Sequence, residues 1–130
     1  MVALAVDETF LRQKTILIID DCRFVRTTYK LLLNDSYSLF EAENGREAIK
    51  LLKLFVPDLI ICDIQMPIMN GIETILKIAE DPVTSKIPLI LASSENDLSS
   101  IAFRLGIRNI CSKDSITTKM LSLIDKIMCG

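Results

Sequence analysis

The sequence predicts an α/β fold in which a doubly wound parallel β-sheet is covered by helices on both faces. Five short apolar runs recur along the 130 residues, and at least three of them are continuous rather than alternating, as strands buried on both faces are. Between these runs, apolar residues recur at the spacing of amphipathic helices. Repeated β-then-α units of this kind form parallel sheets through right-handed crossover connections.

The five apolar runs mark the expected strands. These strands span residues 16–19, 37–40, 59–62, 89–92 and 109–111, the last being the weakest run. Residues with strong turn preferences lie between the expected strands and helices, namely Asn34-Asp35, Asn44-Gly45, Pro57, Asn70-Gly71, Asp81-Pro82, Pro88 and Gly106. No internal repeat or linker interrupts this pattern, so we expect one domain.

Each expected helix carries an apolar stripe. The stripes are Phe24, Thr28, Leu31 and Leu32; Ala48, Ile49, Leu52 and Phe55; Ile72, Ile75, Leu76 and Ala79; Leu98, Ile101, Ala102 and Leu105; and Ile116, Met120, Leu123, Ile124 and Ile127. Residues at this spacing share one side of a helix. We therefore expect each stripe to face the sheet.

The composition excludes several classes of function. Half of the residues are hydrophobic and the net charge is −2, so the chain can build a core and lacks the basic surface of a nucleic-acid or membrane binder. Histidine is absent, which excludes an imidazole base or phosphate carrier within the chain. The N-terminus does not resemble a signal peptide and no apolar run approaches about 20 residues, so we expect a soluble, cytoplasmic protein.

The four cysteines do not form a recognisable metal or redox motif. They are Cys22, Cys62, Cys111 and Cys129, and no two of them are spaced as C-x-x-C. Without histidine to complete a ligand set, a zinc site is not expected. We interpret the cysteines as small buried hydrophobic residues in a reducing compartment.

Polar side chains follow the expected strands at their carboxyl ends. They are Asp20 and Asp21 after the first strand, Asp63 after the third, Ser93, Ser94 and Glu95 after the fourth, and Lys113 after the fifth. The carboxyl ends of parallel strands lie at one edge of the sheet, where ligands bind. We therefore expect these groups to converge.

Three converging carboxylates repel one another unless a cation neutralises them. Oxygen ligands without histidine or thiolate favour Mg²⁺. A carboxylate can attack phosphorus to give an acyl phosphate, while Mg²⁺ and a lysine stabilise the charge on the phosphoryl oxygens. The residues thus predict phosphoryl chemistry, but by themselves they do not identify the nucleophilic aspartate.

Residues 63–71, Asp-Ile-Gln-Met-Pro-Ile-Met-Asn-Gly, resemble the D-x-x-M-P-x-M-[DN]-G signature of the receiver domains of two-component response regulators. The Asp20-Asp21 pair is similar to the acidic pair of that family, residues 41–48 resemble its A-x-[DN]-G-x-E-A turn, and residues 88–93 resemble the strand that ends in its hydroxyl residue. The resemblance implies a flavodoxin-like sheet of five parallel strands in order 2-1-3-4-5 with five helices. It places a receiver domain at residues 14–130, after an N-terminal extension of residues 1–13.

The resemblance also implies the metal and the phosphoacceptor. Asp63 would receive a phosphoryl group from a phosphohistidine on a partner histidine kinase or histidine phosphotransfer protein. Asp21 and Asp63 would bind Mg²⁺ directly and Asp20 through water, and the backbone carbonyl of Gln65 would be a further ligand. The chain would then be a signalling phosphoacceptor with self-catalysed, Mg²⁺-dependent phosphotransfer and dephosphorylation, and not an enzyme acting on a separate substrate.

Other residues would stabilise, release or report the phosphoryl group. Lys113 would pair with the phosphate, and the Ser93 hydroxyl would follow it inward as the domain switches. Gln65 and Glu95 match the positions that tune hydrolysis of the acyl phosphate, and Glu95 favours rapid self-dephosphorylation. Ile110 matches the switch position, which couples phosphorylation to the face formed by the fourth helix, fifth strand and fifth helix. A downstream protein would bind this face of a monomer or weak dimer, without direct nucleic-acid or membrane binding.

Three positions depart from the family pattern. Ser93 stands where threonine is usual, Ile110 where an aromatic residue is usual, and Asp114 where a proline, generally cis, follows the lysine. We expect a trans peptide or a rebuilt loop after Lys113, because a cis bond before a residue other than proline costs about 3 kcal/mol. Asp114 either draws Lys113 away from the phosphate site or, together with Ser115, caps the last helix.

Two other classes of function remain open at this point. A pseudo-receiver would use the same fold as an interaction module without aspartyl phosphorylation, and the three departures favour it. A phosphatase of the dehalogenase type would need a second aspartate two residues after the nucleophile, where Gln65 stands, and a flavin-binding protein would need a phosphate-binding loop after the first strand. The sequence does not decide whether residues 1–13 pack on the domain.

Overall fold

Five parallel strands form a sheet in the order β2-β1-β3-β4-β5 in the computed structural model, which describes residues 13–129. The strands are β1 (Thr15–Ile19), β2 (Ser38–Ala42), β3 (Leu59–Cys62), β4 (Leu89–Ser93) and β5 (Asn109–Ser112). The helices are α2 (Arg23–Leu33), α3 (Gly45–Leu52), α4 (Gly71–Glu80), α5 (Leu98–Leu105) and α6 (Leu121–Cys129). The predicted fold class and strand order are confirmed. Residues 1–12, which make up most of the expected N-terminal extension, lie outside the described part.

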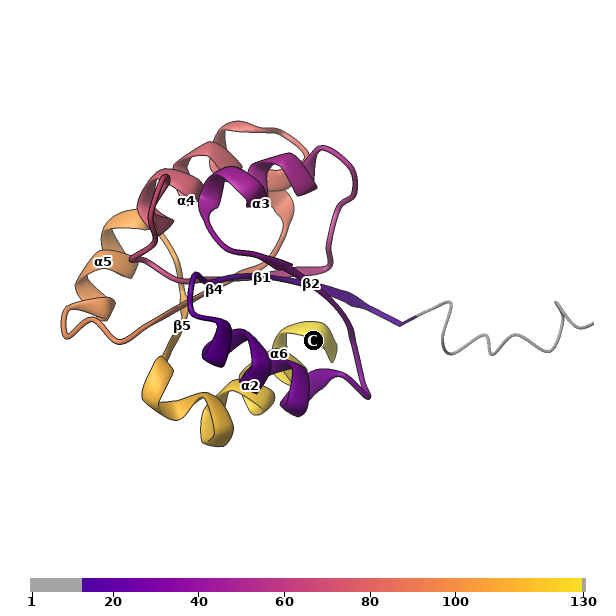
Figure 1. Ribbon diagram of the computed structural model, residues 1–130. Coiled ribbons are helices and arrows are strands. Elements are labelled where there is room, and N and C mark those ends of the chain that lie inside the picture. Colours follow the sequence, from indigo (N-terminus) through magenta and orange to yellow (C-terminus); the bar gives the residue numbers. More distant parts are fainter. Residues whose placement is uncertain (1–12, 130) are drawn as a thin grey trace, which may run out of the picture.

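The helices cover both faces of the sheet. Helices α3, α4 and α5 lie on one face, and α2 and α6 lie on the other (Figure 1). Each face has its own hydrophobic core, one built with Leu52 and Ile75 and the other with Leu33 and Ile124. In the described residues no helix is long and apolar enough to cross a membrane.

The central strands are buried on both faces, which explains their continuous apolar runs. Every residue of β3 is buried, as is β1 from Ile16 to Ile19. The second strand begins and ends later than expected, because its pairing with β1 continues through Glu41 and Ala42 beyond the apolar run. The free edge of β2 leaves Phe40 exposed, with its ring 4.6 Å from that of Phe55 between centroids.

The predicted stripe on α2 was wrong for Phe24 and Leu31, whereas Thr28 and Leu32 are partly buried and Leu32 packs against the core. Phe24 and Leu31 are 79% and 85% exposed, and the helix instead buries Tyr29 and Leu33. Two overlapping apolar stripes wind around this helix, and helical spacing alone does not tell which one faces the sheet.

Helix α4 departs from its predicted stripe in a smaller way. Leu76 and Ala79 are exposed, whereas Thr74 and Ile78 join Ile75 in the interior. The stripes expected on the other three helices are buried or partly buried.

The cysteines were predicted to be buried, and this holds for only two of them. Cys62 and Cys111 are buried in β3 and β5, whereas Cys22 and Cys129 are exposed at the start of α2 and the end of α6. Strand positions bury a small thiol between two helical layers, and helix ends do not.

The segment after β5 contains three types of helix in succession. A 3₁₀ turn at Lys113–Ser115 leads into a π-helical turn at Ile116–Met120 and then into α6. The peptide after Lys113 is trans, since residues 13–129 contain no cis bond. The Ser112 hydroxyl caps this segment by accepting a hydrogen bond from Asp114 N at 3.2 Å. The expectation that Asp114 or Ser115 provides the cap was therefore wrong.

Candidate functional site

The strand ends bring a lysine between two buried carboxylates. Asp20 follows β1, Asp63 follows β3 and Lys113 follows β5, so parallel strands deliver all three to one edge of the sheet. Lys113 Nζ lies 2.9 Å from Asp20 Oδ2 and 2.8 Å from Asp63 Oδ2. Asp20 and Asp63 are only 2% and 4% exposed. The expectation that Asp114 might draw Lys113 away is contradicted, because Lys113 pairs with the two acids.

The electrostatics of this site are those of a crowded acidic cluster. Burial and the charge of Asp20 raise the pKa of Asp63, although the hydrogen bond from Lys113 opposes the shift. Burial lowers the pKa of Lys113, but its bonds to Asp63 and Asp20 outweigh this and raise that pKa. Lys113 is therefore held protonated, and it supplies one positive charge against a surplus of negative charge.

Three carboxylates form a donor set that suits a hard divalent cation. Oxygens of Asp20, Asp21 and Asp63 lie within 4.8 Å of one another, and Asp21 is exposed to solvent. Lys113 neutralises only part of their charge, and the set contains neither sulfur nor nitrogen. These residues fit Mg²⁺, which favours carboxylate oxygens and keeps several of its waters.

An open pocket of about 410 Å³ brings most of the predicted site residues together. It is lined by Asp21, Asp63, Gln65, Ser93, Ser94, Glu95, Asn96 and Lys113. Ser93 is buried at the end of β4, where its Oγ accepts a hydrogen bond from Glu95 N at 3.2 Å. Gln65 and Glu95, the two residues expected to tune hydrolysis, both line this pocket.

Helix α4 begins directly against the backbone of Asp63. Gly71 N donates to Ile64 O at 2.7 Å, and a Cβ at Gly71 would lie 1.9 Å from Asp63 O. Only glycine permits this approach. Asn70 and Glu73 complete a capping box that fixes the start of the helix. The Asn70-Gly71 pair thus has a structural role in holding the loop that follows Asp63.

Ile68 adopts a backbone conformation that is rare for a branched residue. Its φ is +69°, and Met69 N donates to Pro67 O at 2.7 Å across it. Left-handed conformations cost about 1–2 kcal/mol for residues other than glycine. Met69 O in turn accepts from Gly45 N at 3.1 Å, so this tight turn ties the loop after β3 to the start of α3.

Two residues of α2 that the sequence analysis did not single out lie beside the acidic cluster. Arg26 Nη1 donates to the backbone carbonyl of Asp20 at 2.8 Å. Tyr29 is buried, its hydroxyl has no hydrogen-bond partner among the described residues, and burial together with Asp20 raises its pKa. No sequence motif marks either residue, because both contacts depend on how α2 is rotated against the sheet.

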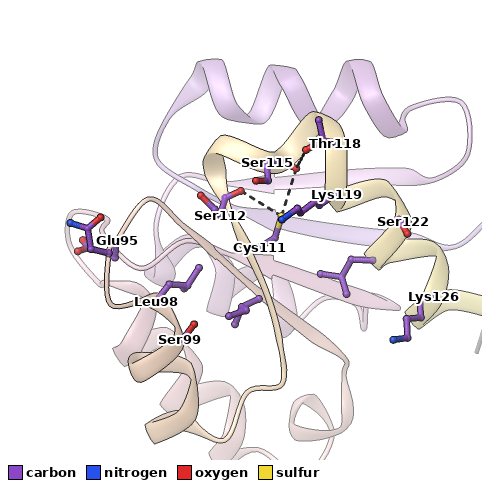
Figure 2. Close-up of a pocket in the computed structure, with 13 residues that line it drawn as sticks. Glu95, Leu98, Ser99, Cys111, Ser112, Ser115, Thr118, Lys119, Ser122 and Lys126 are labelled. Carbon is purple, nitrogen blue, oxygen red and sulfur yellow. Dashed lines mark hydrogen bonds between the residues drawn. The ribbon is translucent and has the colours of Figure 1, made fainter.

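A larger groove of about 660 Å³ lies between α5, β5 and α6, away from the carboxylates (Figure 2). Ile110, the predicted switch residue, lines this groove and is partly buried. Leu98 of α5 and Leu123 of α6 add apolar surface, while Lys119 and Lys126 bring positive charge. Glu95 lines both this groove and the acidic pocket, so the two are adjacent.

A family model for the response regulator receiver domain matches residues 16–125. The chain is 33% identical over 114 residues to the chemotaxis protein CheY of Listeria monocytogenes, covering 85% of this chain and 95% of that protein. It is 45% identical over 86 residues, or 66% of its length, to histidine kinase P4 of Formosa agariphila, but these are only 6% of that kinase. It also spans about half the length, 55%, of the transcriptional and nitrate response regulators that it matches.

Solved structures agree with these similarities. The receiver domain of a signal transduction histidine kinase from Syntrophus aciditrophicus has a TM-score of 0.82 at 28% identity, covering 90% of this chain and 91% of that one.

Proposed function

The chain belongs to the family of response regulator receiver domains, and we propose that within this family it is a working phosphoacceptor in which Asp63 receives a phosphoryl group from a phosphohistidine of a partner protein. The partner is a histidine kinase or a histidine phosphotransfer protein. The observation that carries the proposal is the position of Lys113, whose ammonium bridges Asp20 and Asp63 at 2.9 and 2.8 Å in a site that is otherwise acidic. A pseudo-receiver would have no need to retain this buried arrangement.

The residues define how the transfer proceeds. A carboxylate oxygen of Asp63 forms a bond to phosphorus while the bond from phosphorus to the donor imidazole nitrogen breaks, and that nitrogen keeps the electron pair and is reprotonated by solvent. Asp20, Asp21 and Asp63 would hold Mg²⁺, which when bound supplies positive charge to the phosphoryl oxygens. Lys113 supplies a second positive charge from the carboxyl end of β5, at the same edge of the sheet.

Ser93 and Ile110 provide a route from the phosphoryl group to the groove beside β5. The Ser93 hydroxyl lies at the acidic pocket, and because its oxygen accepts from Glu95 N, its O–H is available to donate to a phosphoryl oxygen. Ser93 pairs in register with Ser112, and Ile110 lines the groove of Figure 2 two residues earlier in the same strand. We propose that a downstream protein binds this groove and reads the change.

The exposed side of α2 is a suitable contact for the phosphodonor. Phe24 lies in the first turn of this helix, next to the acidic pair, and lines a small pocket with Lys113 and Asp114. Its 79% exposure is unusual for an aromatic side chain in a chain with few of them. A donor that packs on Phe24 would bring its phosphohistidine close to Asp63.

Phosphorylation can be measured by intact mass after incubation with acetyl phosphate and Mg²⁺. We expect a gain of one phosphoryl group that depends on Mg²⁺ and is lost in Asp63→Asn. A matched control is Asp58→Asn, because Asp58 precedes the same strand at its opposite end. This control should be phosphorylated like the wild type.

Absence of a mass gain, together with failure to form a beryllofluoride complex, would contradict this function and favour the pseudo-receiver. If the acyl phosphate forms, its decay tests the roles of Gln65 and Glu95. Glu95→Ala should slow the decay if the carboxylate orients the attacking water.

A further inference from the structure

We propose that Arg26 is a positioning residue for the metal site, which it serves by clamping the peptide that joins Asp20 to Asp21 onto the neighbouring strand β2. The proposal rests on the function proposed above, because it assigns Arg26 a role in organising the acidic pair for Mg²⁺. It adds a residue of α2 to a site otherwise built from strand ends.

The Arg26 guanidinium makes two directed contacts. Nη1 donates to the carbonyl oxygen of Asp20 at 2.8 Å, and Nε donates to Glu41 Oε1 at 2.9 Å. The side chain of Arg26 is only 11% exposed. A charged group this far from water is stable only when it is paired and hydrogen-bonded, so the two contacts fix the guanidinium in place.

The contact on Asp20 acts on both carboxylates at once. The carbonyl of Asp20 belongs to the peptide whose nitrogen belongs to Asp21, so rotation of that peptide would redirect the two side chains together. The other polar groups of Asp20 are also engaged, since its backbone N donates to Ala42 O at 3.0 Å and its Oδ1 accepts from Cys22 N at 2.9 Å. Arg26 thus restrains the carbonyl of Asp20, whose side chain faces the like charges of Asp21 and Asp63.

Glu41 anchors the clamp to the sheet. It lies in β2, paired in register with Ile18, and its second oxygen contacts Lys30 Nζ at 2.6 Å. Burial raises the pKa of Glu41, but hydrogen bonds from Lys30 and Arg26 outweigh this and hold it below its ordinary value. Glu41 therefore stays ionised, and it holds Arg26 from the side opposite Asp20.

A guanidinium is needed for this geometry. Its planar fork presents several N–H donors in fixed directions, so it can serve a carbonyl and a carboxylate together, whereas an ammonium is a compact charge without that fork. The clamp thereby keeps the acidic pair in one orientation before a cation arrives. Residues that orient metal ligands in this way typically contribute about 10-fold to 100-fold in metal affinity.

The test is the Mg²⁺ dissociation constant, measured by calorimetry well below the unfolding temperature. We expect R26Q to bind Mg²⁺ about tenfold more weakly than the wild type. R26K, which keeps the charge but not the fork, and E41Q, which keeps Arg26 but weakens its anchor, should show smaller losses. The matched control is R23Q, which removes the same charge from an exposed position on the same helix and should change affinity little.

A purely structural ion pair would give a different result. R26Q would then unfold at a lower temperature and still bind Mg²⁺ as R23Q does, and this outcome would overturn the proposal. If R26Q does not fold, R26K and E41Q decide by the same comparison with R23Q. If the wild type binds Mg²⁺ but Asp63 accepts no phosphoryl group, the proposed function fails while the titrations still judge the clamp. If the wild type binds no Mg²⁺, both fail.

Discussion

Strand β3 leads to Asp63 and strand β5 leads to Lys113, the two partners of the central ion pair. The two strands differ in how tightly they are packed. Strand β3 lies between β1 and β4, is buried throughout, and runs into a loop on which Gly71 closes without room for a side chain. Strand β5 is at the edge of the sheet, buries only Cys111, and runs into a segment wound as 3₁₀, π and α-helix. Asp63 is thus fixed in position, whereas Lys113 stands on a backbone that can adjust.

This difference suits a phosphoacceptor. The attacking carboxylate gains from a rigid position, because reactive geometry must be met closely. In the proposed transfer its counter-charge would change partner, from a carboxylate to a phosphoryl group, and regions of lower packing supply such movements. Substitutions that disturb the support of Asp63 should therefore destabilise the protein more than substitutions on the side of Lys113.

The largest effect is expected on the rigid side. Gly71→Ala places a Cβ against the backbone of Asp63 and Ile64, which cannot yield as a flexible side chain can. We expect the free energy of unfolding to fall by about 3 kcal/mol, measured by urea denaturation. Gly106→Ala is the control, because Gly106 has φ +73° but open space around it, and should cost about 1 kcal/mol. Equal losses in the two variants would show that the close contact at Gly71 is unimportant.

Removing the shared cation should have a somewhat smaller effect that depends on pH and metal. Lys113→Met leaves Asp20 and Asp63 buried without their partner. We expect a loss of about 2 kcal/mol at neutral pH, below the roughly 3–5 kcal/mol of a fully buried pair because the Lys113 side chain is 15% exposed. The pKa of Asp63 lies above its ordinary value even with Lys113 present. The folded variant therefore binds a proton more tightly than the unfolded chain, and its stability should recover as the pH falls from neutral through that raised pKa.

Mg²⁺ should also restore the stability of Lys113→Met, and by more than it stabilises the wild type, because it supplies the missing positive charge. Unfolding with and without Mg²⁺ measures this difference. Lys126→Met, at the groove beside α6, should show neither dependence. A pH profile parallel to that of the wild type would contradict the assignment of Lys113 as the counter-charge.

The smallest effect is expected for the hydrogen bond that holds α6, at the end of the segment that follows β5. Tyr37 OH donates to Asp125 Oδ1 of α6 at 3.1 Å, and burial followed by this hydrogen bond raises the pKa of Tyr37 to about 12. The folded protein then keeps a proton that the unfolded chain has lost, so stability should fall as the pH rises from about 10 to about 12. Tyr37→Phe should remove about 1–2 kcal/mol of that fall. If the stability of the wild type and of Tyr37→Phe changes with pH in the same way, this hydrogen bond does not stabilise the fold.

The sequence predicted the rigid side of the molecule better than the adjustable side. Strands buried on both faces must be apolar throughout, so β1 and β3 are visible as runs, and the acids that follow them meet for topological reasons. The capping of the last helical segment by Ser112 was not predicted, because several polar residues near Asp114 could serve equally well.

Rotation of a helix is also poorly determined by its own sequence. On α2 the stripe containing Phe24 and Leu31 competes with the one containing Tyr29 and Leu33, and the sheet selects the second. The same rotation places Arg26 against Asp20 and Glu41, so the clamp could not be found without the structure. Motifs marked the groups at the centre of the site and the Asn70-Gly71 pair that supports Asp63, but they did not mark Arg26.

The strand order has a consequence for the growing chain on the ribosome. Strand β1 pairs with both β2 and β3, so these three strands can pair before the last two have been synthesised. Asp20, Asp21 and Asp63 belong to that early part, whereas Lys113 is made 50 residues after Asp63. A nascent chain that pairs these strands early would therefore bring its carboxylates together before Lys113 has been made.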